Sequence, residues 1–127
     1  MKYTIEKTEK YTLLQLHEEK LNSIVAPELK SELVKLNAEG IRNIILDISD
    51  VKYVDSSGLS SILVGNRVCE NLEGLFAIAS PNEHVMKLIK ISQLDSILTI
   101  LPTKEEAIDA IFMSELEKHL RAEGAEE

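Results

Sequence analysis

Two adjacent serines follow a buried strand and open a helix. Residues 55–58 read Asp-Ser-Ser-Gly, and they come shortly after the nearly all-apolar run 44–48. A hydroxyl group at the start of a helix is exposed and faces the positive end of the helix dipole, which favours a bound or attached phosphate. The sequence therefore predicts a place where a phosphate is added, removed or sensed.

A helix cap is the alternative role for these serines, because serine is among the preferred N-cap residues. One hydroxyl is enough for a cap, however, and the chain offers two. Asp55 or Ser56 can cap the helix and leave Ser57 free. Gly58, which has no side chain, would let the backbone of a partner come close. We therefore expect Ser57 to be the modified residue, with Ser56 as the second choice.

The helix predicted at 59–72 has two different sides. At about 100° per residue, one side gathers residues expected to face the core: Leu59, Ile62, Leu63, Asn66 and Cys69. The opposite side carries a small, mildly apolar strip in line with Ser57, formed by Ser61, Val64 and Val68. This strip is predicted to point outward and to dock a partner. The alternative is that it packs against a neighbouring helix.

The sequence gives little support for an enzymatic function. The nucleophile elbow of hydrolases needs Gly-x-Ser-x-Gly, and Val54 stands where its first glycine would be. The three histidines have no recognisable partner motif, and the chain has no phosphate-binding glycine loop and no His/Cys metal spacing. The aspartates at 47, 50 and 55 suit weak Mg²⁺ binding, but aspartate is also common in turns. We expect no catalysis, no metal and no cofactor.

Composition limits the partners. The chain has 127 residues, enough for one domain, and a net charge of −8 disfavours nucleic acid and anionic membranes as partners. Its single cysteine, Cys69, is predicted to be a small core residue and cannot form an internal disulfide, which fits a reducing compartment. No apolar run approaches the ~20 residues that span a bilayer. These features predict a cytoplasmic protein without membrane insertion.

Strands and helices alternate along the chain after an initial hairpin. The predicted strands are 3–7, 11–16, 44–48, 75–79 and 97–101. Helices are predicted from Pro27 to about Gly40, over 59–72, from a capping box at 80–83 to about Lys90, and from a second box at 103–106 through Leu116. This order predicts an α/β domain over residues 1–117, with a mixed, largely parallel sheet of about five strands and about four helices. The polar tail 118–127 is expected to fray.

Five short stretches carry a resemblance to a known family: 26–29 (Ala-Pro-Glu-Leu), 45–51, 54–59, 80–81 and 94–97. With them the chain resembles the STAS domain family (sulphate transporter and anti-sigma factor antagonist), in its small single-domain form, from about Tyr3 to Phe112. The resemblance implies that the second serine of the pair, Ser57, is phosphorylated by a partner that is both an anti-sigma factor and a serine kinase. The unmodified protein would capture that partner, and a metal-dependent serine phosphatase would reset the cycle.

The resemblance also marks two departures and one alternative. In the loop near residues 92–94 the family favours a glycine, and this chain has Ser92-Gln93-Leu94. Where the family often has an aspartate in the loop before Ala26, this chain has Asn22 or Ser23. Loss of that carboxylate is expected to alter the contact with the kinase. Asn22 therefore joins Asp55, Ser56 and Gly58 among the expected partner-binding residues. The alternative function is a constitutive STAS subunit of a transporter or of a multi-STAS regulatory assembly, which would never be phosphorylated.

Overall fold

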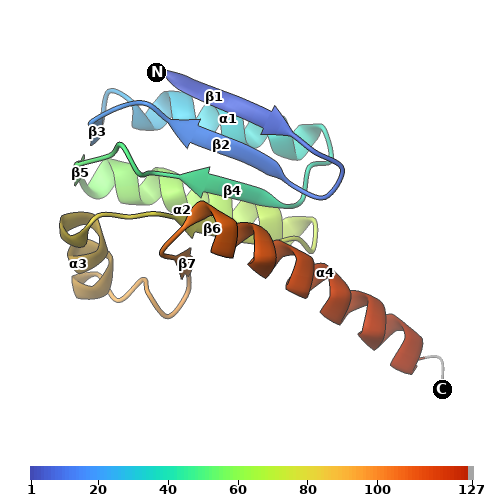
Figure 1. Cartoon of the computed structure of the whole chain (residues 1–127). Coiled ribbons are helices and arrows are strands. Elements are labelled where there is room, and N and C mark those ends of the chain that lie inside the picture. The colour runs from blue at the N-terminus through green and yellow to red at the C-terminus, as the bar shows by residue number, and fades with distance from the viewer. Residues whose placement is uncertain (126–127) are drawn as a thin grey trace.

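A five-stranded sheet forms the centre of the molecule (Figure 1). The structure is a computed structural model and describes residues 1–125. The sheet has the order β1-β2-β4-β6-β7, and its strands are β1 (Tyr3–Lys7), β2 (Thr12–Leu16), β4 (Ile44–Asp47), β6 (Phe76–Ala79) and β7 (Thr99–Leu101). β1 and β2 are antiparallel and the other neighbouring pairs are parallel. The predicted mixed, largely parallel sheet is confirmed.

Helices cover both faces of this sheet. α1 (Ala26–Ala38) and α2 (Ser56–Asn71) contact each other on one face, and α4 (Lys104–Ala125) lies on the other against β4, β6 and β7. α3 (Glu83–Ile91) lies beside β5 at the carboxyl ends of the parallel strands (Figure 1). Because β4 and β6 are covered on both sides, all their residues are buried, which explains their continuous apolar sequences.

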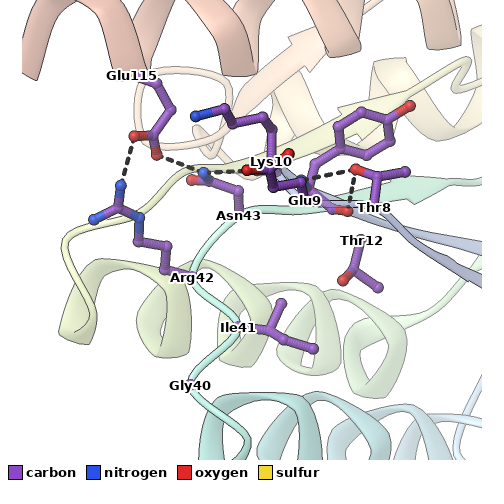
Figure 2. A pocket seen from close by; sticks show the side chains of 10 residues that line it. Thr8, Glu9, Lys10, Thr12, Gly40, Ile41, Arg42, Asn43 and Glu115 are labelled. Carbon is purple, nitrogen blue, oxygen red and sulfur yellow. Dashed lines mark hydrogen bonds and ion pairs between the residues drawn. The ribbon is translucent and has the colours of Figure 1, made fainter.

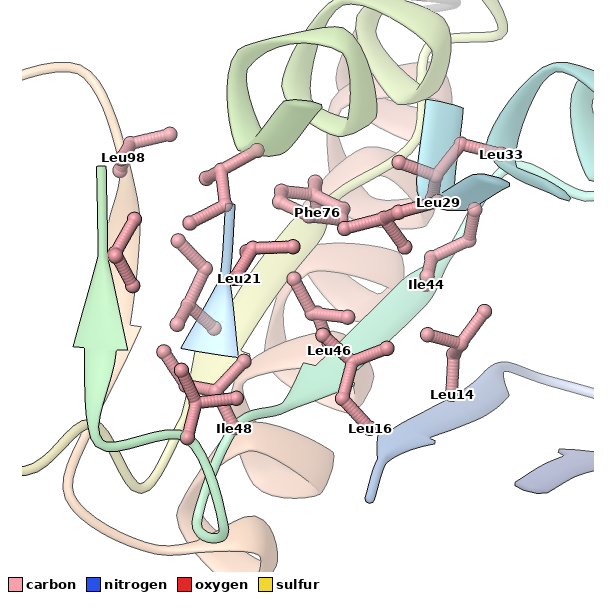
Figure 3. Packing of buried hydrophobic residues seen from close by; sticks show 14 of the residues in the cluster. Leu14, Leu16, Leu21, Leu29, Leu33, Ile44, Leu46, Ile48, Phe76 and Leu98 are labelled. Atoms are coloured by element: carbon pink, nitrogen blue, oxygen red, sulfur yellow. The ribbon is translucent and has the colours of Figure 1, made fainter. Parts of the chain in front are cut away.

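The larger core lies between the sheet and the pair α1 and α2 (Figure 3). Leu29 and Leu33 of α1 meet Ile44 and Leu46 of β4, and Phe76 of β6 lies beneath α2. Aliphatic side chains supply nearly all of this interior, as the composition predicts.

A second sheet of two very short strands was not predicted. β3 (Lys20–Leu21) pairs in parallel with β5 (Tyr53–Val54), and Leu21 lies opposite Val54. Two residues are too few for a period-2 pattern, so the sequence alone carries no signal for either strand. This small sheet matters because β5 leads directly into the serine pair.

The third helix begins two residues later than its predicted capping box implies. Asn82, and not Ser80, is its N-cap, because Asn82 Oδ1 accepts a hydrogen bond from Val85 N at 2.8 Å. Ser80 has a φ of 60° and its amide donates to Leu101 O. The second predicted box is confirmed, since Thr103 Oγ1 accepts from Glu106 N at 3.1 Å.

The expected frayed tail is wrong for residues 118–125, because α4 continues through Ala125. Ion pairs between residues four apart support these last turns: His119 with Glu123 at 3.0 Å, and Arg121 with Glu117 at 3.8 Å. Residues 126 and 127, the rest of that prediction, lie outside the described residues.

Candidate functional site

The serine pair forms the first turn of α2, as predicted. Asp55 is the N-cap, and its Oδ1 accepts a hydrogen bond from Gly58 N at 2.9 Å. Ser56 is exposed and Ser57 is partly buried. Among residues 1–125, neither serine hydroxyl takes part in a hydrogen bond within the protein. Of the two residues expected to cap the helix, Asp55 and Ser56, it is Asp55 that does so, and the Ser57 hydroxyl is left free as expected.

Gly58 has an internal role, and the expectation that it makes room for a partner is wrong. It is buried, and a Cβ atom at this position would lie 2.2 Å from the carbonyl oxygen of Leu21 and 2.8 Å from Cγ1 of Val54. The helix start therefore packs directly on the small β3–β5 sheet. Only glycine allows this approach without moving backbone.

The predicted outward strip on α2 is also wrong. Ser61 is fully buried, Val68 is 7 % exposed, and Val64 packs partly buried against the core. Ser61 Oγ donates a hydrogen bond to Gly58 O at 2.6 Å, so its hydroxyl is satisfied inside the helix. α2 packs against α1 as well as against the sheet, so more than its sheet-facing side is buried. The alternative, packing against a neighbouring helix, is correct.

Burial of α2 thus extends over two neighbouring sides. Ile62 and Cys69 are fully buried, as the predicted core face requires, while Leu59, Leu63 and Asn66 on the same face remain partly exposed. Burial raises the pKa of the Cys69 thiol to about 12, against a smaller opposite effect of a hydrogen bond with the Ile44 backbone.

Two exposed apolar side chains lie on the elements that hold the serine pair. Ile24 is 78 % exposed and follows β3, and Tyr53 of β5 is 54 % exposed. Asp55 N donates to Leu21 O at 3.2 Å, which ties the loop after β3 to the helix start. The Tyr53 ring meets that of His84 edge-on, with centroids 5.7 Å apart. Sequence reasoning missed both residues, although an apolar residue inside a polar loop was an available signal.

Asn22 shapes the turn that leads into α1. Its Oδ1 accepts hydrogen bonds from Ile24 N at 3.0 Å and from Val25 N at 3.2 Å, and its carbonyl accepts from Ala26 N. These bonds fix the backbone of the turn that carries Ile24. Any contact of Asn22 with a partner stays a prediction.

The three aspartates near the serine pair each have a local partner. Asp47 is buried and its Oδ1 accepts from Ser49 N at 2.9 Å, which closes a turn after β4. Asp50 pairs with His17 Nδ1 at 3.1 Å, and Asp55 caps α2. Residues 1–125 contain no group of three side chains arranged to hold a metal ion. Asp47 and Asp55 therefore serve a local turn and a helix cap, and Asp50 contacts a histidine that is distant in sequence.

A polar cavity of about 270 Å³ lies at the opposite edge of the sheet, where the parallel strands begin (Figure 2). Arg42 and Asn43 precede β4, and both bind the carboxylate of Glu115 from α4. Asn43 Nδ2 also donates to Lys10 O at 3.0 Å, and Asn43 Oδ1 accepts from Leu75 N at 2.9 Å. These contacts hold α4 against the sheet. The cavity lies far from Ser57.

The surroundings of Glu115 favour the charged form of its carboxyl group. Burial by itself would raise the pKa of the Glu115 carboxyl, but the Asn43 hydrogen bond and the charges of Arg42 and Lys118 outweigh it. The pKa of Glu115 therefore lies below its ordinary value.

A family model described as the STAS domain matches residues 2–107. The chain belongs to the STAS domain family. A protein of Thermotoga neapolitana, described as a candidate anti-sigma factor antagonist, is 36 % identical over 73 residues, which are 58 % of this chain and 65 % of that protein. This chain thus spans just under two thirds of that relative.

Solved STAS structures share the fold. The crystal structure of a candidate anti-sigma factor antagonist from Thermotoga maritima is 28 % identical with a TM-score of 0.76, covering 86 % of this chain and 93 % of that one. SpoIIAA, a Bacillus cell fate determinant, solved in its phosphorylated form, is 22 % identical with a TM-score of 0.67, covering 87 % of this chain and 99 % of that one. None of the helices within residues 1–125 is long and apolar enough to cross a membrane.

Proposed function

We propose that this protein is an anti-sigma factor antagonist whose partner binding is switched by phosphorylation of Ser57. The observation that carries the proposal is the free hydroxyl of Ser57 in the first turn of α2, where Asp55 already supplies the cap. The descriptions of the Thermotoga relatives support the role, and SpoIIAA, described in a phosphorylated form, supports the switch. In this proposal the unmodified chain holds an anti-sigma factor that is also a serine kinase.

The docking surface proposed for this partner is the exposed rim of the serine pair. Ile24 in the turn after β3 and Tyr53 of β5 offer exposed apolar side chains, and Ser56 lies exposed at the helix start. Asn22 holds the Ile24 turn in place. An apolar pair beside a polar acceptor suits a protein interface, in which a few large side chains supply most of the affinity.

Phosphorylation at this place would weaken binding without unfolding the chain. A phosphate adds about −1.5 to −2 charges. At a helix N-terminus it gains about 0.3–1 kcal/mol from the dipole, so the fold tolerates it. Burying the same charge unpaired in an interface costs several kcal/mol. Since each ~1.4 kcal/mol is tenfold in affinity, a loss of a hundredfold or more follows. The carboxylate of Asp55, beside Ser57, adds to the repulsion.

The chain has a passive part in this cycle. The partner kinase supplies ATP and the phosphoryl group, and a metal-dependent serine phosphatase removes the phosphate in the cytoplasm. We propose no catalytic residue and no cofactor in the antagonist itself. Its contribution is to present Ser57 to both enzymes and the apolar rim to the anti-sigma factor.

Mapping the phosphate on protein recovered from its native cells is the first test, by intact mass and then by peptide mapping. One phosphate on Ser57 that changes with growth condition is the expected result. A chain without phosphate under every condition would favour the alternative, a constitutive STAS subunit of a transporter or multi-STAS assembly.

Matched variants then separate the switch from the fold. Ser57→Asp should weaken binding of the captured kinase at least about a hundredfold, whereas Ser60→Asp, an exposed serine one turn further along α2, should leave it within about threefold. Amide NMR shifts outside residues 50–70 should be unchanged in both variants. Equal binding by Ser57→Asp and the wild type, or unfolding of Ser57→Asp, would contradict the switch.

A further inference from the structure

The outer face of the small β3–β5 sheet carries an exposed lysine beside an exposed tyrosine. β3 pairs with β5 in such a register that Lys20 lies opposite Tyr53. The next pair, Leu21 and Val54, is buried. Because successive side chains of a strand point to opposite faces, Lys20 and Tyr53 share the outward face of this sheet. Lys20 is exposed and Tyr53 is 54 % exposed, so both are available to another protein.

Lys20 has no anionic partner within residues 1–125, where its ammonium group forms no ion pair. The carboxylates of the flanking segments each have a partner of their own: Glu18 accepts from Lys2 N at 2.7 Å, Glu19 pairs with Lys52 at 3.3 Å, Asp50 pairs with His17 at 3.1 Å, and Asp55 caps α2. The charge of Lys20 is therefore free to pair with a carboxylate of another protein.

Tyr53 places an aromatic ring close to the serine pair. It lies four residues before Ser57, and β5 leads from it directly to the Asp55 cap. The edge-on contact with His84 of α3 supports one side of the ring. A supported tyrosine offers a large contact area at little cost in side-chain entropy. Lys20 and Tyr53 thus form one charged and one aromatic contact point at the rim of the serine pair.

We propose that Lys20 and Tyr53 decide which anti-sigma factor this chain captures. The inference rests on the proposed function and names the chemistry of the partner, whose contact surface carries a carboxylate for Lys20 next to an apolar side chain for Tyr53. A partner with a lysine or arginine at the first place would set like charges together and be rejected.

The lysine serves selection more than overall attraction. The net charge of −8 by itself draws basic surfaces toward the chain. A single cation at the rim then discriminates among them by what stands directly opposite it. Asn22, two residues further on, does not compete, because it is uncharged and its side-chain oxygen already accepts from Ile24 N and Val25 N.

Calorimetric titration of the unmodified chain with the purified kinase that phosphorylates Ser57, without ATP, tests the selection. Lys20→Glu should raise the Kd at least about tenfold. Lys20→Met, which keeps an aliphatic stem but removes the charge, should raise the Kd less and make it less sensitive to salt. Tyr53→Ala should also raise the Kd at least about tenfold, as loss of an aromatic contact point does.

Lys10→Glu is the matched control, because it makes the same change in net charge. Lys10 is exposed in the turn between β1 and β2, at the edge of the sheet where the parallel strands begin (Figure 1). The Kd of this variant should stay within about twofold of the wild type. Lys10→Glu and Lys20→Glu should both unfold at the urea concentration of the wild type, since both lysines are exposed.

A charge swap separates selection from a general loss of affinity. Among kinase variants in which single surface carboxylates are replaced by lysine, one should bind Lys20→Glu more tightly than it binds the wild-type chain. If none does, or if Lys20→Glu binds the unaltered kinase as the wild type does while Ser57→Asp does not, the selection is overturned and the switch stands. If no kinase of the native cells phosphorylates Ser57, both proposals are overturned.

Discussion

Replacing Gly58 by alanine is expected to destabilise the protein, although alanine is the better helix former. In an open helix this change stabilises by at most about 1 kcal/mol. Here the new Cβ would lie 2.2 Å from the Leu21 carbonyl oxygen, which is backbone and cannot turn aside. β3 would have to move by roughly 1 Å to restore van der Waals contact.

The size of the effect follows from three contributions. Overpacking of a well-packed site costs about 1–3 kcal/mol. Movement of Leu21 also weakens its hydrogen bond with Asp55 N, now 3.2 Å, at a further cost of about 1 kcal/mol. The gain in helix propensity offsets part of this. We expect a net loss of about 2 kcal/mol in the free energy of unfolding, or about 8 °C in Tm.

Urea unfolding followed by far-UV circular dichroism measures this loss. Gly124→Ala is the control, because Gly124 also lies in a helix but a Cβ there has no neighbour within 4 Å among the described residues. Its stability should be unchanged or raised by up to about 0.5 kcal/mol, since it lies in the last turn. A Gly58→Ala protein as stable as the wild type would refute close packing of the helix start on β3.

Three further predictions concern other buried groups. Asn43→Ala should lower the free energy of unfolding by about 2–3 kcal/mol in urea unfolding, because its bonds to Lys10, Leu75 and Glu115 are lost together. The pKa of Glu115 is lowered in the folded state. The stabilisation that its carboxylate gives the fold is therefore present above the unfolded pKa and is lost as pH falls through the folded pKa. In urea unfolding, the wild type should be more stable than Glu115→Gln at neutral pH, and this difference in the free energy of unfolding should disappear in acid. Cys69, whose pKa is raised to about 12, should resist a disulfide reagent at pH 8 until urea unfolds the chain.

Local sequence patterns were sufficient for most of the fold. The continuous apolar runs of β4 and β6 predicted strands covered on both faces, because only buried strands tolerate such sequences. The Asp-Ser-Ser-Gly turn predicted both a helix start and its cap, since a cap is made by residues within one turn of each other. Membership of the STAS domain family, inferred from short motifs, is confirmed by the family match.

Predictions failed where the answer depended on distant parts of the chain. Helical periodicity identified the residues that share a side of α2, but it does not reveal how many sides are covered. Ser61 and Val68 are buried and α2 packs against α1 as well as against the sheet, so the predicted docking strip is internal. Ile24, which follows β3, and Tyr53 of β5 replace that strip in the proposed interface, and β3 and β5 are joined only by the long-range pairing of the small sheet.

Gly58 shows the same division between local and tertiary information. The sequence by itself determined the order of the four helices and of the five strands of the main sheet, the buried central strands and the position of the serine pair at a helix start, because each depends on residues that are close in sequence. Only the tertiary structure decided that Gly58 must be a glycine, that Ser61 is internal and that β3 pairs with β5 next to the helix start. These properties depend on contacts such as that between Gly58 and Leu21, which lie far apart along the chain and meet only when the sheet and helices have packed.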